Sequence, residues 1–260
     1  MTSTPNAVHA RHGYADLLAA SDDHPFVRHE IPAALADVWW RAGDALAVRR
    51  LRHRGGMGIV AFGADAGVGE LVGAVPEIVG SIIQDPAGEP FSVTVPRHLE
   101  SLLRDDLRIL GGGDWDWFLT EVAPAEQPGD EAVVPLDDVS RRDEVTAFLA
   151  RHSPTADTPP AGGEGWFAIE ARPGRLAAVT AYGHTAAGAP HLSSVAVDET
   201  WRGRGLGRRI VSVVTRLAVA EHGVCTLGMY SDNTVARELY LSLGYANPCR
   251  WASRSAVLRD

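Results

Sequence analysis

The sequence predicts an α/β protein built from two domains, and three observations carry this prediction. The first is a strand, a glycine-rich turn and an amphipathic helix in direct succession from His191 to Leu217. The second is the alternation of strand and helix patterns along the rest of the chain. The third is the segment Pro124–Asp130, whose composition is typical of a linker. We therefore expect an N-terminal domain over residues 1–128 and a C-terminal domain over residues 131–260.

The composition indicates an ordinary globular protein of 260 residues, with 45% hydrophobic and 22% charged residues. The formal net charge of −9 argues against nucleic acid as a partner, because binding to a duplex depends on a basic surface. Pro76 and Glu77 interrupt the most apolar run, and the first residues lack the regions of a signal peptide, so we expect no membrane span. Two cysteines form no disulfide framework. These features together favour a cytoplasmic protein.

In the first half, short apolar patterns predict a mixture of helices and strands. Helices are expected at 14–18, 33–40, 69–83 and 98–103, and strands at 45–51, 58–62, 91–95 and 115–121. The run from Gly63 to Gly69 is rich in glycine but contains no arginine or glutamine, and it comes early in the half. It is therefore a poor counterpart of the later glycine-rich turn.

In the second half, the patterns predict the order strand, helix, three strands, helix, strand, helix, strand. The expected ranges are 133–136, a helix capped by Ser140 and ending at Arg151, 166–171, 176–183, 192–197, the helix after the turn, 224–230, a helix from Asn233 and 250–257. The helix after the turn is expected to bury one face, made of Leu206, Ile210, Val213, Val214 and Leu217.

The glycine-rich turn has the features of a phosphate-binding loop. Its residues are Arg202, Gly203, Arg204, Gly205, Leu206, Gly207 and Arg208. Glycines allow the backbone to approach a ligand, and the free N–H groups at the start of the helix favour an anion. The Walker pattern is absent, since no lysine follows Gly207. The dinucleotide pattern is also incomplete, because Arg208 stands where the third glycine belongs, which counts against a nucleotide-binding oxidoreductase.

Arg202, Gly205 and Gly207 match the pattern Arg/Gln-x-x-Gly-x-Gly/Ala, which resembles the coenzyme A pyrophosphate loop of the GNAT superfamily of N-acyltransferases. Downstream, a second match resembles the other GNAT signature, Asn-x-x-Ala-x-x-x-Tyr-x-x-x-Gly-Phe/Tyr. Its residues are Asn233, Ala236, Tyr240, Gly244 and Tyr245. The resemblance covers the second half and implies a mixed, mostly antiparallel sheet flanked by helices. The first half is then either an unrelated α/β domain or a degenerate GNAT-like copy.

The resemblance implies roles for particular residues. The main chain of Val195, Ala196 and Val197 would contact the pantetheine arm, residues Arg202–Arg208 would bind the pyrophosphate, and Asn233 would lie beside the pantetheine. Tyr240 would be the general acid that protonates the leaving thiolate. Simpler alternatives remain for three of these residues: Tyr240 as a packed tyrosine bonded to the backbone, Arg202 as a solvated charge, and Asn233 as a helix cap.

The general base is not identified by the sequence. Candidates on the expected acceptor side are Glu170, His184, His191 and Asp232, with water relayed through backbone groups as an alternative. The aromatic side chains considered as walls of an acceptor pocket are Trp115, Trp117 and Trp166, although aromatic residues at strand spacing more often lie in a core. We expect the first half to bind no cofactor and to shape this pocket.

The resemblance implies an N-acetyltransferase that moves the acetyl group of acetyl-CoA to a primary amine by direct attack in a ternary complex, without a metal. Two alternatives are an O-acyltransferase or one using a longer chain, and a module that binds acyl-CoA without turnover. The acceptor is expected to be a small molecule or a peptide amine, with no nucleic acid and no membrane as partner. We also consider a homodimer.

Overall fold

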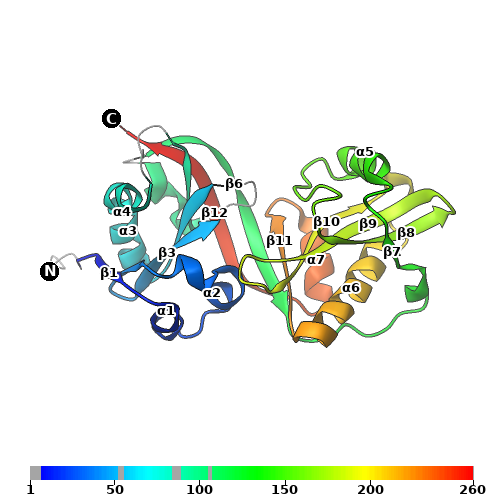
Figure 1. Ribbon diagram of the computed structural model, residues 1–260, viewed down its shortest axis with the longest axis horizontal. Coiled ribbons are helices and arrows are strands. Elements are labelled where there is room, and N and C mark those ends of the chain that lie inside the picture. The colour runs from blue at the N-terminus through cyan, green and yellow to red at the C-terminus, as the bar shows by residue number, and fades with distance from the viewer. Residues whose placement is uncertain (1–6, 52–55, 84–88, 105–106, 260) are drawn as a thin grey trace. The chain divides into compact units, whose positions relative to one another are not determined.

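The computed structural model describes residues 7–51, 56–83, 89–104 and 107–259, and these form two compact units (Figure 1). The N-terminal unit comprises Met1–Asp116, Tyr230–Asp232 and Cys249–Asp260, and the C-terminal unit comprises Trp117–Met229 and Asn233–Pro248. This division differs from the expected boundary at the 124–130 linker. The reason is that strand pairing between residues far apart in the sequence, rather than the linker, decides where each end segment packs.

In the described part of the first half, strands and short helices lead up to β6, a strand with residues in both units. In chain order these are β1 (His9–Arg11), α1 (Tyr14–Ala20), α2 (Pro25–Glu30), the 3-10 turn η1 (Ala33–Leu35), β2 (Trp39–Ala42), β3 (Ala45–Leu51), β4 (Met57–Gly63), α3 (Asp65–Gly73), α4 (Val75–Ile82), β5 (Phe91–Pro96), the 3-10 helix η2 (Arg97–Arg104) and β6 (Leu107–Thr120). Strands β1 to β4 pair antiparallel in sequence, and β4 pairs parallel with β5.

The second half follows the predicted order of elements. They are η3 (Asp130–Ala132), β7 (Val134–Leu136), α5 (Arg142–His152), β8 (Gly165–Arg172), β9 (Arg175–His184), β10 (Pro190–Val197), η4 (Glu199–Trp201), α6 (Leu206–His222), β11 (Cys225–Tyr230), α7 (Thr234–Ser242) and β12 (Ala246–Leu258). Strands β7 to β10 pair antiparallel in sequence, and β10 pairs parallel with β11. The predicted mixed, mostly antiparallel sheet is confirmed.

The two halves therefore repeat one strand pattern. In each, four antiparallel strands are followed by a parallel fifth, with a helical connection before the fifth strand. This repetition favours the degenerate-copy alternative for the first half. The run from Gly63 to Gly69 covers the end of β4 and the first residues of α3, and this junction corresponds to the one between β10 and α6. The sequence-based objection that this run comes too early was wrong.

The sixth strand of each half pairs outside its own half. Strand β12 pairs antiparallel with β5 in the N-terminal unit, from Trp251 opposite Pro96 to Ala256 opposite Phe91. Strand β6 is the sheet neighbour of β11, and its residues from Trp117 onward belong to the C-terminal unit. Each unit is thus completed by a strand from the other half of the sequence.

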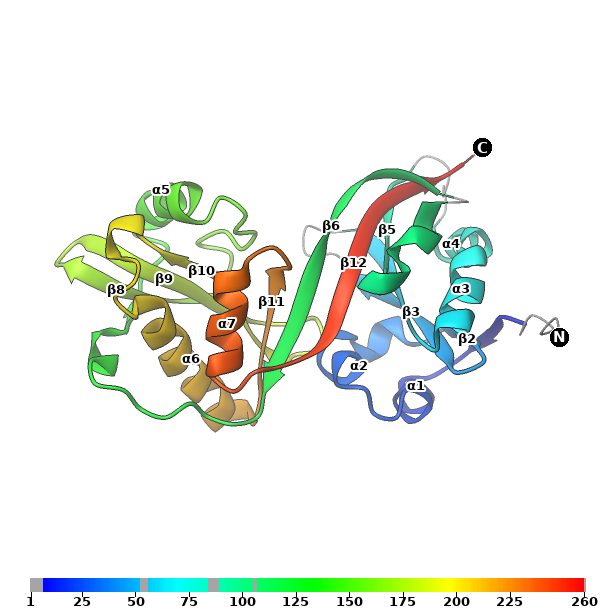
Figure 2. The same ribbon diagram turned by 180° about the vertical axis from the view of Figure 1, so that it is seen from behind.

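Helices cover both faces of the sheet in the C-terminal unit (Figure 2). Helix α5 packs on one face through Val145, Phe148 and Leu149, in a core that includes Trp166 and Ala181. Helices α6 and α7 pack on the opposite face, in a core that includes the side chains of Ile169, Leu192, Leu227, Ile210 and Tyr240. These two layers leave β10 and β11 between them.

Some local predictions were wrong. The helix expected at 33–40 is a 3-10 turn followed by β2, because Trp39 and Trp40 pair with strands on both sides and are buried. The helix expected at 98–103 is the 3-10 helix η2. Ser140 does not cap α5: the capping position is Arg141, which makes no side-chain cap bond.

The buried face of α6 is also shifted from the expected one. Leu206, Ile210 and Val214 are buried as expected, but Val213 is only partly buried and Leu217 is exposed. The remaining buried positions are Val211, Ser212, Thr215 and Ala218. The polar residues among them were not expected to face a core.

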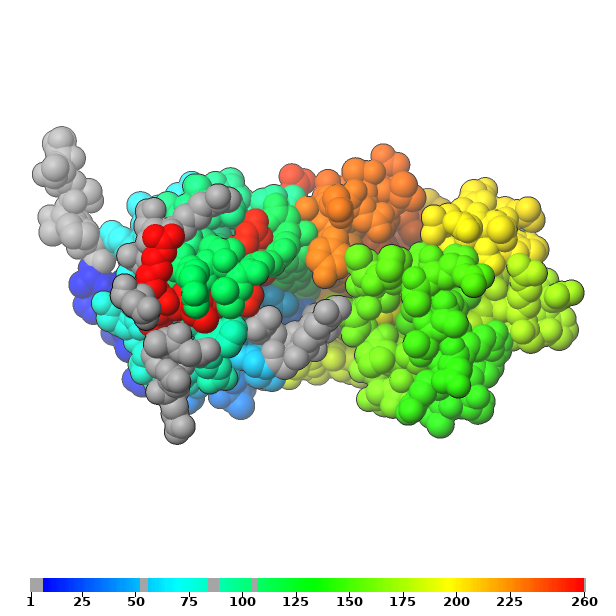
Figure 3. Space-filling model, turned by 90° about the horizontal axis from the view of Figure 1, so that it is seen from above, coloured from blue at the N-terminus to red at the C-terminus, as the bar shows by residue number. Residues whose placement is uncertain are grey.

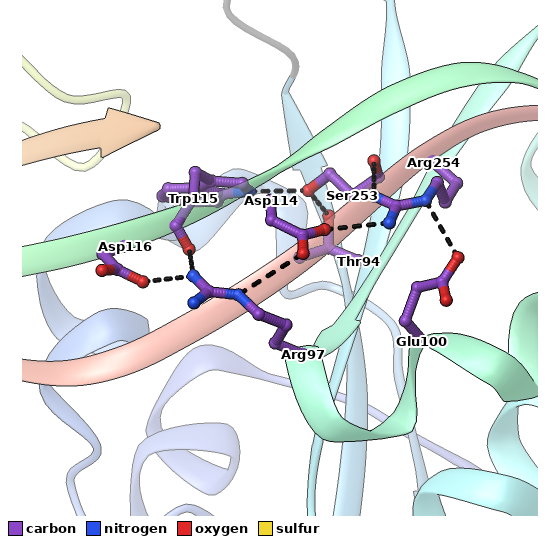
Figure 4. Close-up of polar contacts among 8 residues, drawn as sticks. All are labelled: Thr94, Arg97, Glu100, Asp114, Trp115, Asp116, Ser253 and Arg254. Atoms are coloured by element: carbon purple, nitrogen blue, oxygen red, sulfur yellow. Dashed lines mark hydrogen bonds and ion pairs between the residues drawn. The ribbon is translucent and has the colours of Figure 1, made fainter. Parts of the chain in front are cut away.

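An ionic network stabilises the N-terminal unit where η2, β6 and β12 meet (Figure 4). Arg97 forms an ion pair with the fully buried Asp116, and its Nε lies 3.7 Å from Asp114. Arg254 binds the same Asp114 at 2.9 Å and Glu100 at 3.3 Å. Because each carboxylate in this network contacts a guanidinium, the charges within the unit compensate one another.

None of the helices in the described ranges has the length and apolarity that a membrane span requires. In the same ranges no group of three or more histidine, cysteine, aspartate or glutamate side chains is arranged to hold a metal ion. Cys225 and Cys249 are both buried and free.

Candidate active site

Strand β10 contains a bulge in its middle. Its pairing with β9 passes from Ser193 opposite Ala181 to Ala196 opposite Val179, so two residues of β10 face one residue of β9. Within the bulge Ser194 has a φ of 52°, which is uncommon for a residue with a side chain. A bulge leaves main-chain groups unpaired and bends the strand. It therefore exposes backbone donors and acceptors in the middle of the sheet.

Strands β10 and β11 separate just before this bulge. Their parallel pairing joins His191 to Thr226 and Leu192 to Leu227, and it ends there. Val195, Ala196 and Val197, predicted to contact the pantetheine arm, lie beyond the point of separation. Their main chain borders the opening between the two strands. An extended ligand could bind to such a free strand edge as an additional strand does.

The glycine-rich turn follows β10 after the short turn η4. Gly203 and Gly205 have φ values of 75° and 76°, in the left-handed region that glycine adopts without strain. Gly205 is the N-cap of α6 and offers no side chain to bond the first N–H groups. Within residues 107–259, the backbone N–H groups of Gly205, Leu206, Gly207 and Arg208 have no acceptor. The positive end of α6 is thus open to an anion.

The space around the glycines of the turn also favours an anion at the start of α6. A methyl group added at Gly203 or Gly205 would meet no atom within 4 Å, so both glycines face open space. At Gly207 an added carbon would lie 3.6 Å from Val197 Cγ2 and 3.7 Å from Leu239 Cδ2. Gly207 therefore allows the first turn of α6 to pack closely against β10 and α7, whereas Gly203 and Gly205 keep the approach to the amides clear.

The arginines of the turn have three different environments. Arg202 donates from Nε to the carbonyl oxygen of Val197 (3.2 Å) and from Nη2 to that of His152 (3.1 Å), so its side chain holds the turn rather than lying free in solvent. The Arg204 guanidinium lies 4.6 Å from the ring centre of Trp201. Arg208 donates to the Ser242 hydroxyl at 2.5 Å. All three predicted positions surround the turn, and Arg202 uses two of its five N–H donors to hold it.

The buried Asp198 caps the short 3-10 turn η4, which leads into the glycine-rich turn. Its carboxylate accepts hydrogen bonds from the Thr200 amide (2.8 Å) and the Thr200 hydroxyl (2.7 Å). These hydrogen bonds from Thr200, with the nearby His152 and Arg175, hold the pKa of Asp198 below its usual value. This role was not identified from the sequence. The signal was an aspartate two residues before a threonine at a strand end, a typical cap.

Asn233 is the N-cap of α7, and its side-chain oxygen accepts a hydrogen bond from the Ala236 amide at 3.1 Å. The capping alternative is therefore confirmed. It leaves the predicted position beside the pantetheine untested. Gly244, expected to stop the helix, follows α7 directly with a φ of 89°.

Tyr240 and Tyr245 lie in the same core with ring centres 5.9 Å apart, but their hydroxyls differ. The Tyr245 hydroxyl bonds Thr215 at 2.7 Å and Cys225 at 3.2 Å. In the described part of the chain, the Tyr240 hydroxyl has no hydrogen-bond partner. Burial raises the pKa of Tyr240 to about 12. The alternative in which Tyr240 bonds the backbone therefore does not apply, and its proton is available.

The candidate bases do not converge. Glu170 accepts from Arg141 at 2.5 Å and from the Gly174 amide at 3.0 Å, and the Arg141 hydrogen bond holds its pKa below the usual value, so it is committed to an ion pair. His184 stacks edge-on against His222 with ring centres 5.4 Å apart. His191 Nδ1 lies 2.9 Å from the Thr226 hydroxyl. Asp232 is exposed and belongs to the N-terminal unit.

The three tryptophans are not gathered in one place. Trp117 and Trp166 are buried, with exposures of 0% and 2%, and Trp166 belongs to the core under α5. Trp115 lies in the N-terminal unit, where its indole donates to the Ser253 hydroxyl at 2.8 Å. Trp117 and Trp166 are therefore core residues rather than walls of an acceptor pocket, as aromatic side chains at strand spacing usually are.

With this geometry established, comparison with known proteins gives the family. Residues 162–247 match the GNAT acetyltransferase domain family. The C-terminal half belongs to the GNAT superfamily. The matched residues of this GNAT domain run from the end of the loop after α5 to the start of β12, and they include the bulge, the turn and Tyr240.

Solved structures are similar to the chain over almost its whole length. A GCN5-related N-acetyltransferase from Sphaerobacter thermophilus is 16% identical with a TM-score of 0.57, covering 97% of this chain and 96% of that one. A GNAT-family protein from Novosphingobium aromaticivorans is 19% identical with a TM-score of 0.53, covering 94% and 97%. At these identities the likeness shows the fold alone.

Among curated proteins, an uncharacterized protein from Mycobacterium leprae is 38% identical over 69 residues. That match spans 26% of this chain and only 19% of the relative. It therefore relates a part of the two proteins, and it carries no activity from one to the other.

Proposed function

We propose that the GNAT domain is an acyltransferase that moves the acetyl group of acetyl-CoA to a primary amine by direct attack in a ternary complex. One observation carries this proposal: unpaired amides at the start of α6, a bulged strand edge, and a buried tyrosine without a partner occur in one unit. These are the three parts that binding a phosphorylated thioester and protonating its sulfur require.

The coenzyme would bind along β10 and the turn. The pyrophosphate would accept from the free amides of Gly205–Arg208, where the dipole of α6 favours negative charge. The pantetheine arm would pair with the main chain of Val195–Val197 in the opening between β10 and β11. Arg204 and Arg208 add positive charge at the rim of the turn.

In the transfer step, a neutral amine nitrogen attacks the thioester carbonyl carbon and forms a C–N bond. Negative charge develops on the carbonyl oxygen, and a backbone N–H of the bulged strand would stabilise it. Collapse of the intermediate breaks the C–S bond, and Tyr240 donates its proton to the leaving sulfur. The surplus proton of the amine passes to solvent. Glu170 is not proposed as its acceptor, because Arg141 already occupies that carboxylate.

The acidity of Tyr240 suits this task once burial is considered. Its pKa of about 12 lies well above the value of about 8.5 for a thiol in water. However, a thiolate leaving inside the domain is also desolvated. Desolvation raises the pKa of a thiol above its value in water. The difference between the pKa of a coenzyme thiol and that of Tyr240 would therefore be smaller than in water, which favours proton transfer.

The test is calorimetric titration of acetyl-CoA into the wild-type protein and into Gly205→Glu. A carboxylate at Gly205 would occupy the open space before the amides and repel the pyrophosphate, so we expect binding to be lost. The matched control is Gly188→Glu, because Gly188 also has a positive φ of 86° and open space around it. That variant should bind like the wild type.

The outcomes separate cleanly. Loss in both variants would mean that backbone strain, rather than the turn, decides binding. Absence of binding to the wild type would overturn the proposed function. Where binding is found, transfer to a panel of primary amines with detection of the released thiol tests turnover and rejects a module that only binds the coenzyme.

A further inference from the structure

The loop between α5 and β8 is fixed to the bulge of β10. The Thr158 hydroxyl lies 2.8 Å from the Ser193 hydroxyl. The Ser194 hydroxyl accepts from the Thr158 amide at 3.3 Å and donates to the Thr158 carbonyl at 3.2 Å. Helix α5 and the residues that follow it lie on the surface seen in Figure 3, in green. The loop therefore borders the place where the thioester carbonyl would lie.

Glu164 ends this loop, directly before β8. In the register of the sheet Trp166 faces Ala181, and both side chains pack under α5. Side chains alternate along a strand, so Glu164 and Gly183, each two residues further out, lie on that same face. An added carbon on Gly183 would lie only 2.8 Å from Glu164 Cγ, so the glutamate side chain lies across this glycine. Gly183 in turn pairs with His191 of β10.

The carboxylate of Glu164 is incompletely satisfied. Its Oε2 is buried and has no hydrogen-bond partner among the described residues. A buried carboxylate oxygen without a donor is costly, and such atoms call for an explanation. Glu170, within β8, shows the usual solution, because it accepts from Arg141 and from the Gly174 amide. Among the described residues, no cation donates to Oε2 of Glu164.

We propose that Glu164 binds a positively charged group of the acceptor, distinct from the amine that attacks. This rests on the proposed function and names its substrate class: amines with a second cationic group, such as α,ω-diamines. The position supports a second group. His191 and Ser193 lie two residues apart on β10, about 7 Å along the strand. Glu164 lies across Gly183, the partner of His191, and His191 is two residues along β10 from Ser193, where the bulge begins and transfer would occur.

The test uses 1,5-diaminopentane and pentylamine, which have the same carbon chain and differ in one cationic group. Titration of each amine into the wild type, Glu164→Gln and Glu131→Gln measures binding without requiring turnover. We expect the wild type to prefer the diamine, and Glu164→Gln to weaken diamine binding about 10-fold or more through loss of a charge-assisted bond. Pentylamine binding should not change.

Glu131→Gln makes the same chemical change at an exposed glutamate of the same unit and should leave the preference intact. Equal affinity of the wild type for both amines would overturn the proposal, and so would an equal loss for both amines in Glu164→Gln. Acetyl-CoA titration of the same proteins reports on the proposed function separately. Glu164→Gln should bind acetyl-CoA like the wild type, and failure of the wild type to bind it would refute the coenzyme site without deciding the diamine result.

Discussion

The turns after β4 and after β10 occupy the same place in the repeated strand pattern. Neither of the helices that follow has a side-chain cap, but the turns differ in the backbone conformation of the N-cap and in charge. After β10, the N-cap is a glycine in the left-handed region and the first turn of the helix is uncapped. After β4, the N-cap Ala64 is extended, and Asp65 brings a carboxylate into the first turn. That carboxylate lies 3.0 Å from His98. A phosphate at the N-terminus of α3 would meet a negative charge.

The strand openings also differ. The pairing of β3 with β4 runs without a register shift from Ala45 to Leu51, whereas β9 and β10 contain the bulge. Strands β4 and β5 separate after Val60, as β10 and β11 do after Leu192. Aromatic rings fill the opening in the N-terminal unit. The ring pairs are Phe62–Trp251 at 6.4 Å, Phe26–Trp251 at 5.0 Å and His24–Phe62 at 4.9 Å between centres.

Strand order alone therefore does not make an anion-binding site. The same topology supports a filled aromatic core in one half and an open edge with free amides in the other. What separates them is local: one bulge, two glycines with positive φ, and the side chains that enter the opening. Each of these differences can be tested by substitution.

The largest expected effect concerns Tyr240 of α7. In the first half η2 takes the place of α7, and η2 contains no tyrosine. Tyr240→Phe removes only the hydroxyl, so we expect kcat to fall by about 10²–10⁴ with little change in acetyl-CoA affinity. Tyr245→Phe is the control: it loses hydrogen bonds to Thr215 and Cys225, which should cost about 1 kcal/mol of stability but leave kcat unchanged.

The pH profile gives an independent check on the same residue. Because burial raises the pKa of Tyr240 to about 12, the acid stays protonated throughout the usual range. The rate should therefore rise with pH as the acceptor amine loses its proton, without a descending limb up to about pH 10. A descending limb below pH 10 in the wild type that is absent from Tyr240→Phe would contradict the raised pKa of Tyr240, and one that persists in Tyr240→Phe would belong to another group.

The second effect tests whether the N-terminal unit acts as a scaffold. Arg97→Met would leave Asp116, which is fully buried, without its guanidinium (Figure 4). We expect the free energy of unfolding to fall by about 3–5 kcal/mol in urea titrations, with acetyl-CoA affinity unchanged while the protein is folded. The matched control is Arg28→Met, whose pair with Asp23 is half exposed and should contribute about 0–1 kcal/mol.

A smaller effect is expected within the turn at Arg202–Arg208. Arg202→Ala removes the bonds to the Val197 and His152 carbonyls, so the turn loses its attachment and acetyl-CoA affinity should fall roughly 10-fold. Arg204→Ala removes a cation–π contact with Trp201 and should cost only about 2–5-fold. Calorimetric titration of acetyl-CoA into both variants measures which loss of affinity is larger. A larger loss of affinity in Arg204→Ala than in Arg202→Ala would show that the hydrogen bonds of Arg202 do not hold the turn.

Sequence reasoning succeeded where the determinants were local. The turn at Arg202–Arg208, the capping Asn233 and the stop at Gly244 follow from neighbouring residues, and so does the order of elements in the second half. The bulge at Ser194 was not predicted, because its neighbours Val195 to Val197 have an ordinary strand pattern and the strain is stabilised by Thr158 and Thr180 from elsewhere. Such contacts leave no periodic pattern in the sequence.

The misplaced elements have the same cause. A run of alanine and tryptophan before Arg41 has helical propensity, yet Trp39 and Trp40 form β2 because β1 and β3 pair with them. The boundary expected near Pro128 was placed on linker composition alone. Only the pairing of β12 with β5 reveals where the end of the chain packs, and a partner more than 150 residues away cannot be read from local pattern.

That exchange of strands affects the order of events during synthesis. A ribosome makes β1 to β5 early, and domains generally fold in the order in which they emerge. Here the partner of β5 is not made until residues 251–256 have been translated. Until then the first unit has an open edge of unpaired main-chain groups, the kind of edge that promotes association between chains. The unit that is synthesised first is therefore the one that finishes folding last.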